Sequence, residues 1–251
     1  MANRVMPSWL VCTTAFAIST SSAIAGDFAN LNVLGFSSDG NIFAFEEFGV
    51  QDGSGFPYAN RFYIDTNTDQ FISGSPIRVR IDDETADVAQ ARSDAASQGQ
   101  SIITDALLSQ NPGYLAGFNA VTEASADPYR MAVNPRPVVP PVDRPIEFRL
   151  SELQFSPSSD CSGIQDVSTG FKLVQLGLEA GQETRLLHED ASVPASRSCP
   201  NGYRIGGVHT FFPEGSEPVY AITIAVRSFG FEGPDYNWMA VTTRDGVIGQ
   251  P

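Results

Sequence analysis

Histidine, cysteine and lysine are scarce in this chain, which has only 2 histidines, 3 cysteines and the single lysine Lys172. A zinc site takes three or four protein ligands, chiefly cysteine and histidine, so this composition argues against bound zinc. The sequence also has no Gly-x-Ser-x-Gly elbow, no phosphate-binding glycine loop and no dinucleotide fingerprint. We therefore expect no cofactor, no metal ion and none of the common nucleotide or serine-hydrolase chemistries.

Both histidines have a structural interpretation. His188 and Glu189 would need a serine to complete a catalytic triad, and without an elbow that exposes this nucleophile we expect His188 to close a strand at the surface. His209 lies within the apolar run from Val208 to Phe212 and is interpreted as a histidine of a strand, not as a metal ligand.

Positive charge is also in short supply, because 29 acidic side chains face 15 basic ones and the net charge is −14. Such a surface repels the phosphates of nucleic acids and of anionic lipids. We therefore expect no nucleic-acid partner, and we interpret the acidic surface mainly as a solvated one.

The first residues have the pattern of a secretory signal peptide. Arg4 supplies the positive charge, Trp9 to Ile24 is apolar or small, and Ala23-Ile24-Ala25 is a small-x-small cleavage site. The stretch is too short and too rich in Ser and Thr for a membrane span, which needs about 20 apolar residues. We expect cleavage of residues 1–25, a mature chain that starts at Gly26 without a transmembrane segment, and a periplasmic or secreted protein.

Cleavage leaves two of the three cysteines. Cys12 departs with the signal peptide, while Cys161 and Cys199 remain in an oxidising compartment. No Cys-x-x-Cys spacing indicates a redox pair, so we predict a structural disulfide between them.

Alternating apolar and polar residues predict a mainly β fold of antiparallel sheets. The predicted strands, which include a hairpin through Gly181-Gln182, cover residues 77–82, 146–150, 171–178, 184–188, 221–227 and 238–243. The alternation shifts phase at Ser151-Glu152, which predicts a β-bulge there.

One segment has helical spacing instead. Its apolar residues recur on one face between Asp83 and Leu108, and Asn111-Pro112-Gly113 ends it. We expect a single amphipathic helix packed on a sheet.

The stretch 134–145 carries five prolines and is expected to be an extended linker. A proline-rich peptide ligand is the alternative interpretation of this stretch. We therefore divide the mature chain into a strand-plus-helix lobe (26–133), the linker, and an all-strand lobe with the disulfide (146–251).

Two loops echo each other, at residues 52–58 and 232–236. Each has an acid-Gly pair, a proline and a tyrosine, and leads through an asparagine into a strand that begins with aromatic residues. Recognition often lies in aromatic-rich loops on a rigid sheet. The candidate partner-binding residues are Asp52, Phe56, Tyr58, Glu232, Tyr236 and Trp238. The alternative is that these rings only cap the core.

The turn Gly35-Phe36-Ser37-Ser38-Asp39-Gly40 resembles the Phe-Ser-x-Asp-Gly turn that joins two strands in each blade of a TolB-type propeller. Only one such turn occurs, and one blade cannot close a ring. The architecture is therefore expected to be sandwich-like or partially propeller-like.

A closer resemblance covers nearly the whole mature chain. The run from Gly35 through Gly49-Val50-Gln51-Asp52-Gly53-Ser54-Gly55-Phe56-Pro57-Tyr58 to Asp65-Thr66 is similar to the opening of the domain-of-unknown-function 2259 family. Gly230-Phe231-Glu232-Gly233-Pro234 with Ala240-Val241-Thr242 resembles its close. The resemblance implies an exported bacterial protein with no assigned activity and supplies no catalytic residues.

Carboxylates offer an enzymatic alternative. Glu46 and Glu47 are neighbours on a strand, so their side chains point to opposite faces and cannot act together. A pair suited to glycoside hydrolysis would have to assemble if the two echoed loops meet, from among Glu46, Asp52, Glu232 and Asp235.

Asp65, Asn67 and Asp69 alternate as at the start of a calcium loop. However, Gln70 and Pro76 stand where that loop needs its glycine and its bidentate glutamate. We interpret these residues as a polar turn between two strands.

Together these observations predict an exported, non-enzymatic module that binds an unidentified protein or envelope component. The alternative is an exported hydrolase that uses loop carboxylates.

Overall fold

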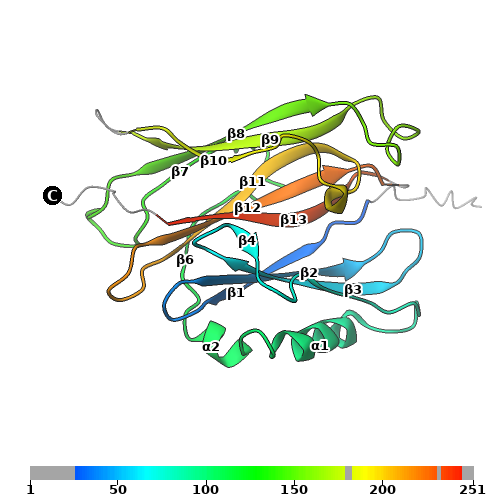
Figure 1. The fold of residues 1–251 in the computed structure, drawn as a ribbon, viewed down its shortest axis with the longest axis horizontal. Helices are drawn as coiled ribbons and strands as arrows, with labels where there is room; N and C mark the ends of the chain where they lie inside the picture. The colour runs from blue at the N-terminus through cyan, green and yellow to red at the C-terminus, as the bar shows by residue number, and fades with distance from the viewer. Residues whose placement is uncertain (1–25, 179–182, 231–232, 245–251) are drawn as a thin grey trace, which may run out of the picture.

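Three antiparallel sheets lie stacked on one another, and helices cover the outer face of one of them (Figure 1). The computed structural model describes residues 26–178, 183–230 and 233–244. The predicted signal peptide, the turn Gly181-Gln182 and Glu232 lie outside these residues. The mainly β fold is confirmed, and its stacked layers form a sandwich.

Each sheet is built largely from neighbouring strands of the chain. The first sheet contains β1 (Asn30–Phe36), β2 (Ile42–Val50), β3 (Pro57–Asp65), β4 (Gln70–Phe71) and β5 (Ile77–Arg80). The central sheet contains, in spatial order, β13 (Asp235–Arg244), β12 (Val219–Ser228), β11 (Pro200–Phe211) and β6 (Tyr114–Phe118). The outer sheet contains β10 (Arg185–Glu189), β9 (Ser168–Gly177), β8 (Ile146–Phe155) and β7 (Arg130–Val133).

The central sheet is buried on both faces, and β12 shows this best. Ile222, Ile224 and Val226 belong to the core shared with the outer sheet. Ala221 and Ala225 alternate with them and belong to the core shared with the first sheet. A strand that packs on both sides has no polar face, which is why the sequence of β12 is almost wholly apolar.

Residues expected to form one helix form two, α1 (Val88–Gly99) and α2 (Asp105–Ser109). The Asp87 carboxylate caps α1 by accepting a hydrogen bond from the Gln90 amide, and Thr104 caps α2. Gly99 ends α1 against the Tyr63 hydroxyl, which would lie 2.0 Å from a Cβ at that position. The single long helix was therefore wrong, whereas one main helix packed on the first sheet is confirmed.

The β-bulge predicted at Ser151-Glu152 is absent. The pairing of β8 with β9 runs without a shift from Ile146 opposite Gly177 to Phe155 opposite Ser168. Phe155 packs over Gly170, where a Cβ would meet its ring at 2.7 Å. The apolar residues change phase because Leu153 and Phe155, both half-buried, lie on the face of the strand opposite to Ile146, Phe148 and Leu150.

The layers do not follow the order of the chain. The proline-rich segment 134–145 joins β7 to β8, which pair with each other in the outer sheet. β6 also precedes that segment, yet it pairs with β11 in the central sheet. Within the described residues, no helix is long and apolar enough to cross a membrane.

The predicted disulfide between Cys161 and Cys199 is present and links residues 38 positions apart. It joins the turn after β8 to the residue that precedes β11, so it ties the outer sheet to the central one.

Replacing both cysteines, as Cys161→Ala with Cys199→Ala, should lower the free energy of unfolding by about 4 kcal/mol, because the unfolded chain regains the entropy of an open loop. Urea unfolding of the oxidised protein and of the double variant measures this loss. A difference below about 1 kcal/mol would show that the bridge adds little.

A second prediction concerns His209, which lies on β11 and is 9% exposed. Burial lowers the pKa of its imidazole from 6.5 to about 4. The folded protein therefore keeps His209 neutral, and stability from this residue is complete above pH 6.5 and is lost as the pH falls towards 4. His209→Gln should flatten the pH dependence of unfolding between these values by up to about 3 kcal/mol; an unchanged pH profile would contradict this.

Candidate functional site

The two echoed loops lie at the same end of the sandwich, on the right in Figure 1. The first loop connects β2 to β3, and the second precedes β13 after β12. Residues 27–29 run between them: Phe28 forms a parallel bridge with Tyr236, and the Tyr236 amide donates to the Asp27 carbonyl at 2.8 Å. Hydrogen bonds thus bring the start of the described chain to the beginning of β13.

The aromatic side chains at this end differ in exposure. Tyr58 is 6% and Trp238 is 5% exposed, and both belong to the core between the first and central sheets. Phe56 and Tyr236 are half-buried, whereas Phe28 is 40% exposed and its ring lies 5.3 Å from that of Tyr236. Tyr58 and Trp238 therefore support this surface from below, and the exposed contact area belongs to their neighbours.

Glu47 joins the two sheets beneath this surface. Its side chain is buried, and its Oε2 accepts a hydrogen bond from the Trp238 amide at 2.6 Å while its Oε1 accepts one from the Asn60 side chain at 2.9 Å. Burial raises the pKa of Glu47, and the hydrogen bonds from Trp238 and Asn60 oppose that rise. The carboxylate provides an acceptor for the Trp238 amide on the outer side of β13, which is the edge strand of the central sheet.

Three aspartates, Asp27, Asp52 and Asp235, lie near enough to one another above Glu47 for their charges to interact. Asp235 Oδ1 accepts a hydrogen bond from the Asp27 amide at 2.9 Å. Burial raises the pKa of Asp27 to about 6, a hydrogen bond with Tyr58 lowers it, and the negative charges of Asp235 and Asp52 raise it further. The pKa of Asp235 is raised by burial and by Asp52. Like charges are therefore concentrated here in a partly desolvated place.

A shallow hollow of about 560 Å³ opens beside these carboxylates. Its lining comes from the start of the described chain, the β2–β3 loop and the segment before α1, and includes Gly26, Asp27, Phe28, Val50, Asp52 and Glu84. The hollow is acidic, with apolar side chains at its edge.

Not all the carboxylates named for a hydrolase lie here. Glu46 points to the opposite face from Glu47, as predicted, and forms ion pairs with Arg92 at 2.7 Å and Arg61 at 3.5 Å under the helices. Glu232 lies outside the described residues. Asp52 and Asp235 are the two candidates that the structure brings together.

The remaining candidates have structural roles. His188 pairs with Asp190 at 2.9 Å, not with Glu189, and Asp190 also binds Arg197 at 2.6 Å. These contacts fasten the segment after β10 beneath the Phe171 ring, on which His188 stacks at 4.5 Å. Among the described residues, no group of three or more His, Cys, Asp or Glu side chains is arranged to hold a metal ion.

The polar turn at residues 65–69 is confirmed. Asp65 accepts a hydrogen bond from the Asn67 amide at 2.8 Å, and Asp69 adopts a left-handed backbone with φ 53°. The Asp69 carboxylate accepts hydrogen bonds from the amide and the hydroxyl of Thr242 at 2.7 and 2.9 Å. The turn thereby attaches the first sheet to β13.

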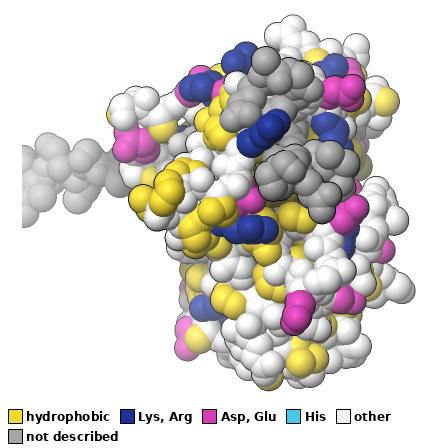
Figure 2. Space-filling view, turned by 90° about the vertical axis from the view of Figure 1, so that its left-hand side faces the viewer, with side chains coloured by type: hydrophobic (Ala, Val, Ile, Leu, Met, Phe, Trp, Pro, Cys, Tyr) yellow, Lys and Arg dark blue, Asp and Glu magenta, His cyan; other side chains and the backbone are white. Residues whose placement is uncertain are grey.

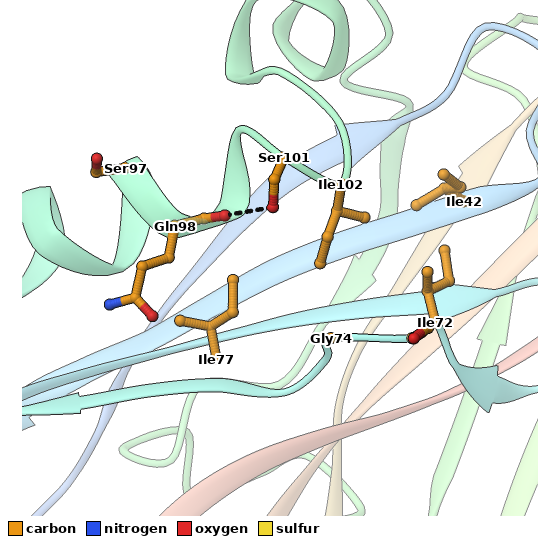
Figure 3. Close-up of a pocket in the computed structure, with 9 residues that line it drawn as sticks. Ile42, Ile72, Gly74, Ile77, Ser97, Gln98, Ser101 and Ile102 are labelled. Carbon is orange, nitrogen blue, oxygen red and sulfur yellow. Dashed lines mark hydrogen bonds between the residues drawn. The ribbon is translucent and has the colours of Figure 1, made fainter.

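A second hollow, of about 760 Å³, lies between α1 and the β3–β5 region (Figure 3). Ile42, Ile72, Ile77 and Ile102 point into it, and Ser101 donates a hydrogen bond to the Gln98 carbonyl at its rim. None of its nine lining residues is charged, so it offers neither an acid nor a base for catalysis.

We call the end of the sandwich that holds the two echoed loops and the acidic hollow the acidic end. Asp27 and Phe28 belong to it but were absent from the sequence-based candidates. They lie just after Gly26, the predicted start of the mature chain, and belong to no alternating pattern, so periodicity does not reveal them. The signal that could have found them is an acidic residue followed by an aromatic one close to the predicted cleavage site.

A family model described as "Predicted secreted protein (DUF2259)" matches residues 44–244. No curated protein and no solved structure matches the chain.

Glu47→Ala should destabilise the fold by roughly 2–4 kcal/mol, because the Trp238 amide and the Asn60 side chain would stay buried without an acceptor. Glu47→Gln should cost less, since its carbonyl replaces one of the two acceptors. Chemical unfolding measures both, with the exposed Glu217→Ala as the matched control, expected within about 0.5 kcal/mol of wild type. Equal stability of Glu47→Ala and the control would refute this role.

Proposed function

Because the chain belongs to the DUF2259 family of predicted secreted proteins, we propose that it is exported by a cleaved signal peptide and acts in the periplasm or outside the cell as a non-enzymatic binding module. The acidic end is its contact surface. The observation that carries this proposal is the meeting of the two echoed loops with residues 27–29 at one end of a rigid sandwich.

The chemistry of this end supports a partner with basic and apolar side chains. Phe28 is 40%, Val50 48% and Phe229 59% exposed, and Phe229 directly follows β12 across from the start of β13. Asp52 and Glu84 line the hollow beside Phe28 and Val50. Apolar side chains next to carboxylates combine burial with charge complementarity, the two features that interfaces use for affinity and orientation.

The opposite end of the sandwich, shown in Figure 2, supplies a control. The proline-rich segment 134–145 lies at that end (Figure 1), and its Val139 is 97% exposed. Hydrophobic side chains also gather on that face, among arginine and acidic side chains. Nonspecific binding through exposed hydrophobic side chains would therefore be detected at both ends of the sandwich.

A photo-crosslinking residue placed at Val50 in the exported protein should yield one major adduct in intact cells, and the same residue at Val139 should not yield that adduct. Phe28→Ser should weaken binding of the crosslinked partner about tenfold or more, as expected for an exposed ring in an interface, and Val139→Ser should leave it unchanged. Identical adducts from both positions, or an unaffected Phe28→Ser variant, would count against the proposal.

One observation favours the exported hydrolase as a second candidate. A carboxyl whose pKa is raised to about 6 lies beside two further carboxyls, Asp52 and Asp235. A carboxyl with a raised pKa is typical of a general acid in a hydrolase.

The purified chain would then cleave a glycan, ester or peptide substrate. Asp52→Asn or Asp235→Asn would abolish turnover while the exposed Asp166→Asn would not. Turnover that survives both substitutions, or no turnover at all, removes this candidate.

A further inference from the structure

We call the hollow between α1 and the β3–β5 region the α1 hollow (Figure 3). Its volume of about 760 Å³ is within the range of small-molecule sites in proteins, roughly 300–1,000 Å³. It shares no lining residue with the acidic hollow. A ligand bound here would therefore not occupy the contact surface proposed above.

Isoleucines form the apolar part of the α1 hollow, and they come from four separate segments. Ile42 begins β2, Ile77 begins β5, Ile72 follows β4, and Ile102 lies between α1 and α2. Ile77 is 7% exposed, whereas the other three are half-buried. A half-buried side chain still has apolar surface that a ligand can remove from water, and this removal favours binding.

The apolar part of the hollow is elongated along β3. Ile77 pairs with Arg61 of that strand, and Ile42 pairs with Asp65 of the same strand. Four residues of a strand span about 13 Å, so the two isoleucines are about that far apart along β3. A strip of this length and composition fits an extended alkyl chain.

Polar side chains gather at the end of the hollow next to Ile77. Ser97 and Gln98 belong to the last turn of α1. In Figure 3 they lie on the side of Ile77, away from Ile42 and Ile72. The side chains of Ser97 and Gln98 make no hydrogen bond with another described residue. A hydroxyl and an amide are thus available to the polar end of a ligand.

No charged residue lines the α1 hollow, although the chain carries 29 acidic and 15 basic side chains. Glu46 and Arg61, which are buried beneath the helices, pair with each other and with residues of α1 and α2, and neither is a lining residue. An ionic ligand would lose water here without gaining a partner of opposite charge, which is costly. The lining therefore favours an uncharged ligand.

We propose that the α1 hollow binds a single uncharged amphiphile. Its alkyl or acyl chain lies along the isoleucines, and its hydroxyl, ester or sugar end lies at Ser97 and Gln98. Such a molecule changes from apolar to polar along its length as the lining does. Ser73 and Gly74 complete the lining. A Cβ at Gly74 would contact only the Ile102 side chain, at 3.8 Å, so this turn leaves the hollow unfilled.

Isoleucine-methyl NMR of the purified protein tests the site directly. Titration with 1-octanol should shift the methyl signals of Ile42, Ile72 and Ile102, while those of the exposed Ile164 and of Ile222 in the core should not move. Octanoate and octylammonium carry the same chain with opposite charges. Both should bind about tenfold more weakly than 1-octanol, because each would lose water without gaining a partner.

Two variants locate the two ends of the ligand. Ile72→Ser should weaken binding of 1-octanol about tenfold through the lost apolar contact, and Ile164→Ser is the matched control that should leave it unchanged. Gln98→Ala should weaken octyl glucoside more than 1-octanol, because the sugar presents more hydroxyls to the polar end. An unmoved Ile222 signal shows that each variant is folded.

Four outcomes would overturn the proposal. They are the absence of any shift, shifts of equal size at Ile164 and in the hollow, tighter binding of either ion than of 1-octanol, and an unaffected Ile72→Ser variant. Signals of the hollow that move when the protein alone is diluted would show that a second copy of the chain fills it, and would overturn the proposal as well.

Discussion

The structure depends on one constraint: the central sheet is covered on one face by the outer sheet and on the other by the first sheet. Every polar group that reaches this sheet must find a partner inside the protein, and the contacts between layers reflect this. Glu47 accepts from the Trp238 amide, Asp69 accepts from Thr242, and Thr210 donates to the Pro135 carbonyl at 2.8 Å. Each contact pairs a polar group of the central sheet with a group from another layer or from the segment between β7 and β8, and so helps to set how the layers align.

The same constraint explains what the sequence reveals and what it conceals. The alternation of β5 and of the first half of β8 is clear in the sequence, and both strands were predicted to begin at the residues where they begin in the structure. The burial of β12 on two faces was not predicted, because an apolar run does not say how many layers cover it. The stacking of three sheets depends on contacts between residues far apart in the chain, which local patterns do not contain.

The site was partly foreseen for a similar reason. Two loops of similar sequence precede strands β3 and β13, and the sequence analysis assigned residues of both to one predicted contact surface. Their aromatic residues were harder to assign, because Tyr58 and Tyr236 look alike in sequence but differ in burial. Exposure is decided by what packs above a strand, and for Tyr58 this is the central sheet. The break between α1 and α2 likewise follows from a distant contact, that of Gly99 with Tyr63.

The order of the layers has a consequence for an exported chain. The rings of Phe36, Phe43, Phe45 and Phe62 on the first sheet are covered by strands β12 and β13, which follow that sheet in the chain and, under the proposed export, would leave a translocation channel after it. The first sheet must therefore wait, with its apolar face in water, while the outer sheet emerges. Pairings between such distant segments form slowly, and exposed apolar strands aggregate readily. A holding chaperone on the far side of the membrane would shield this face until the carboxyl-terminal strands arrive.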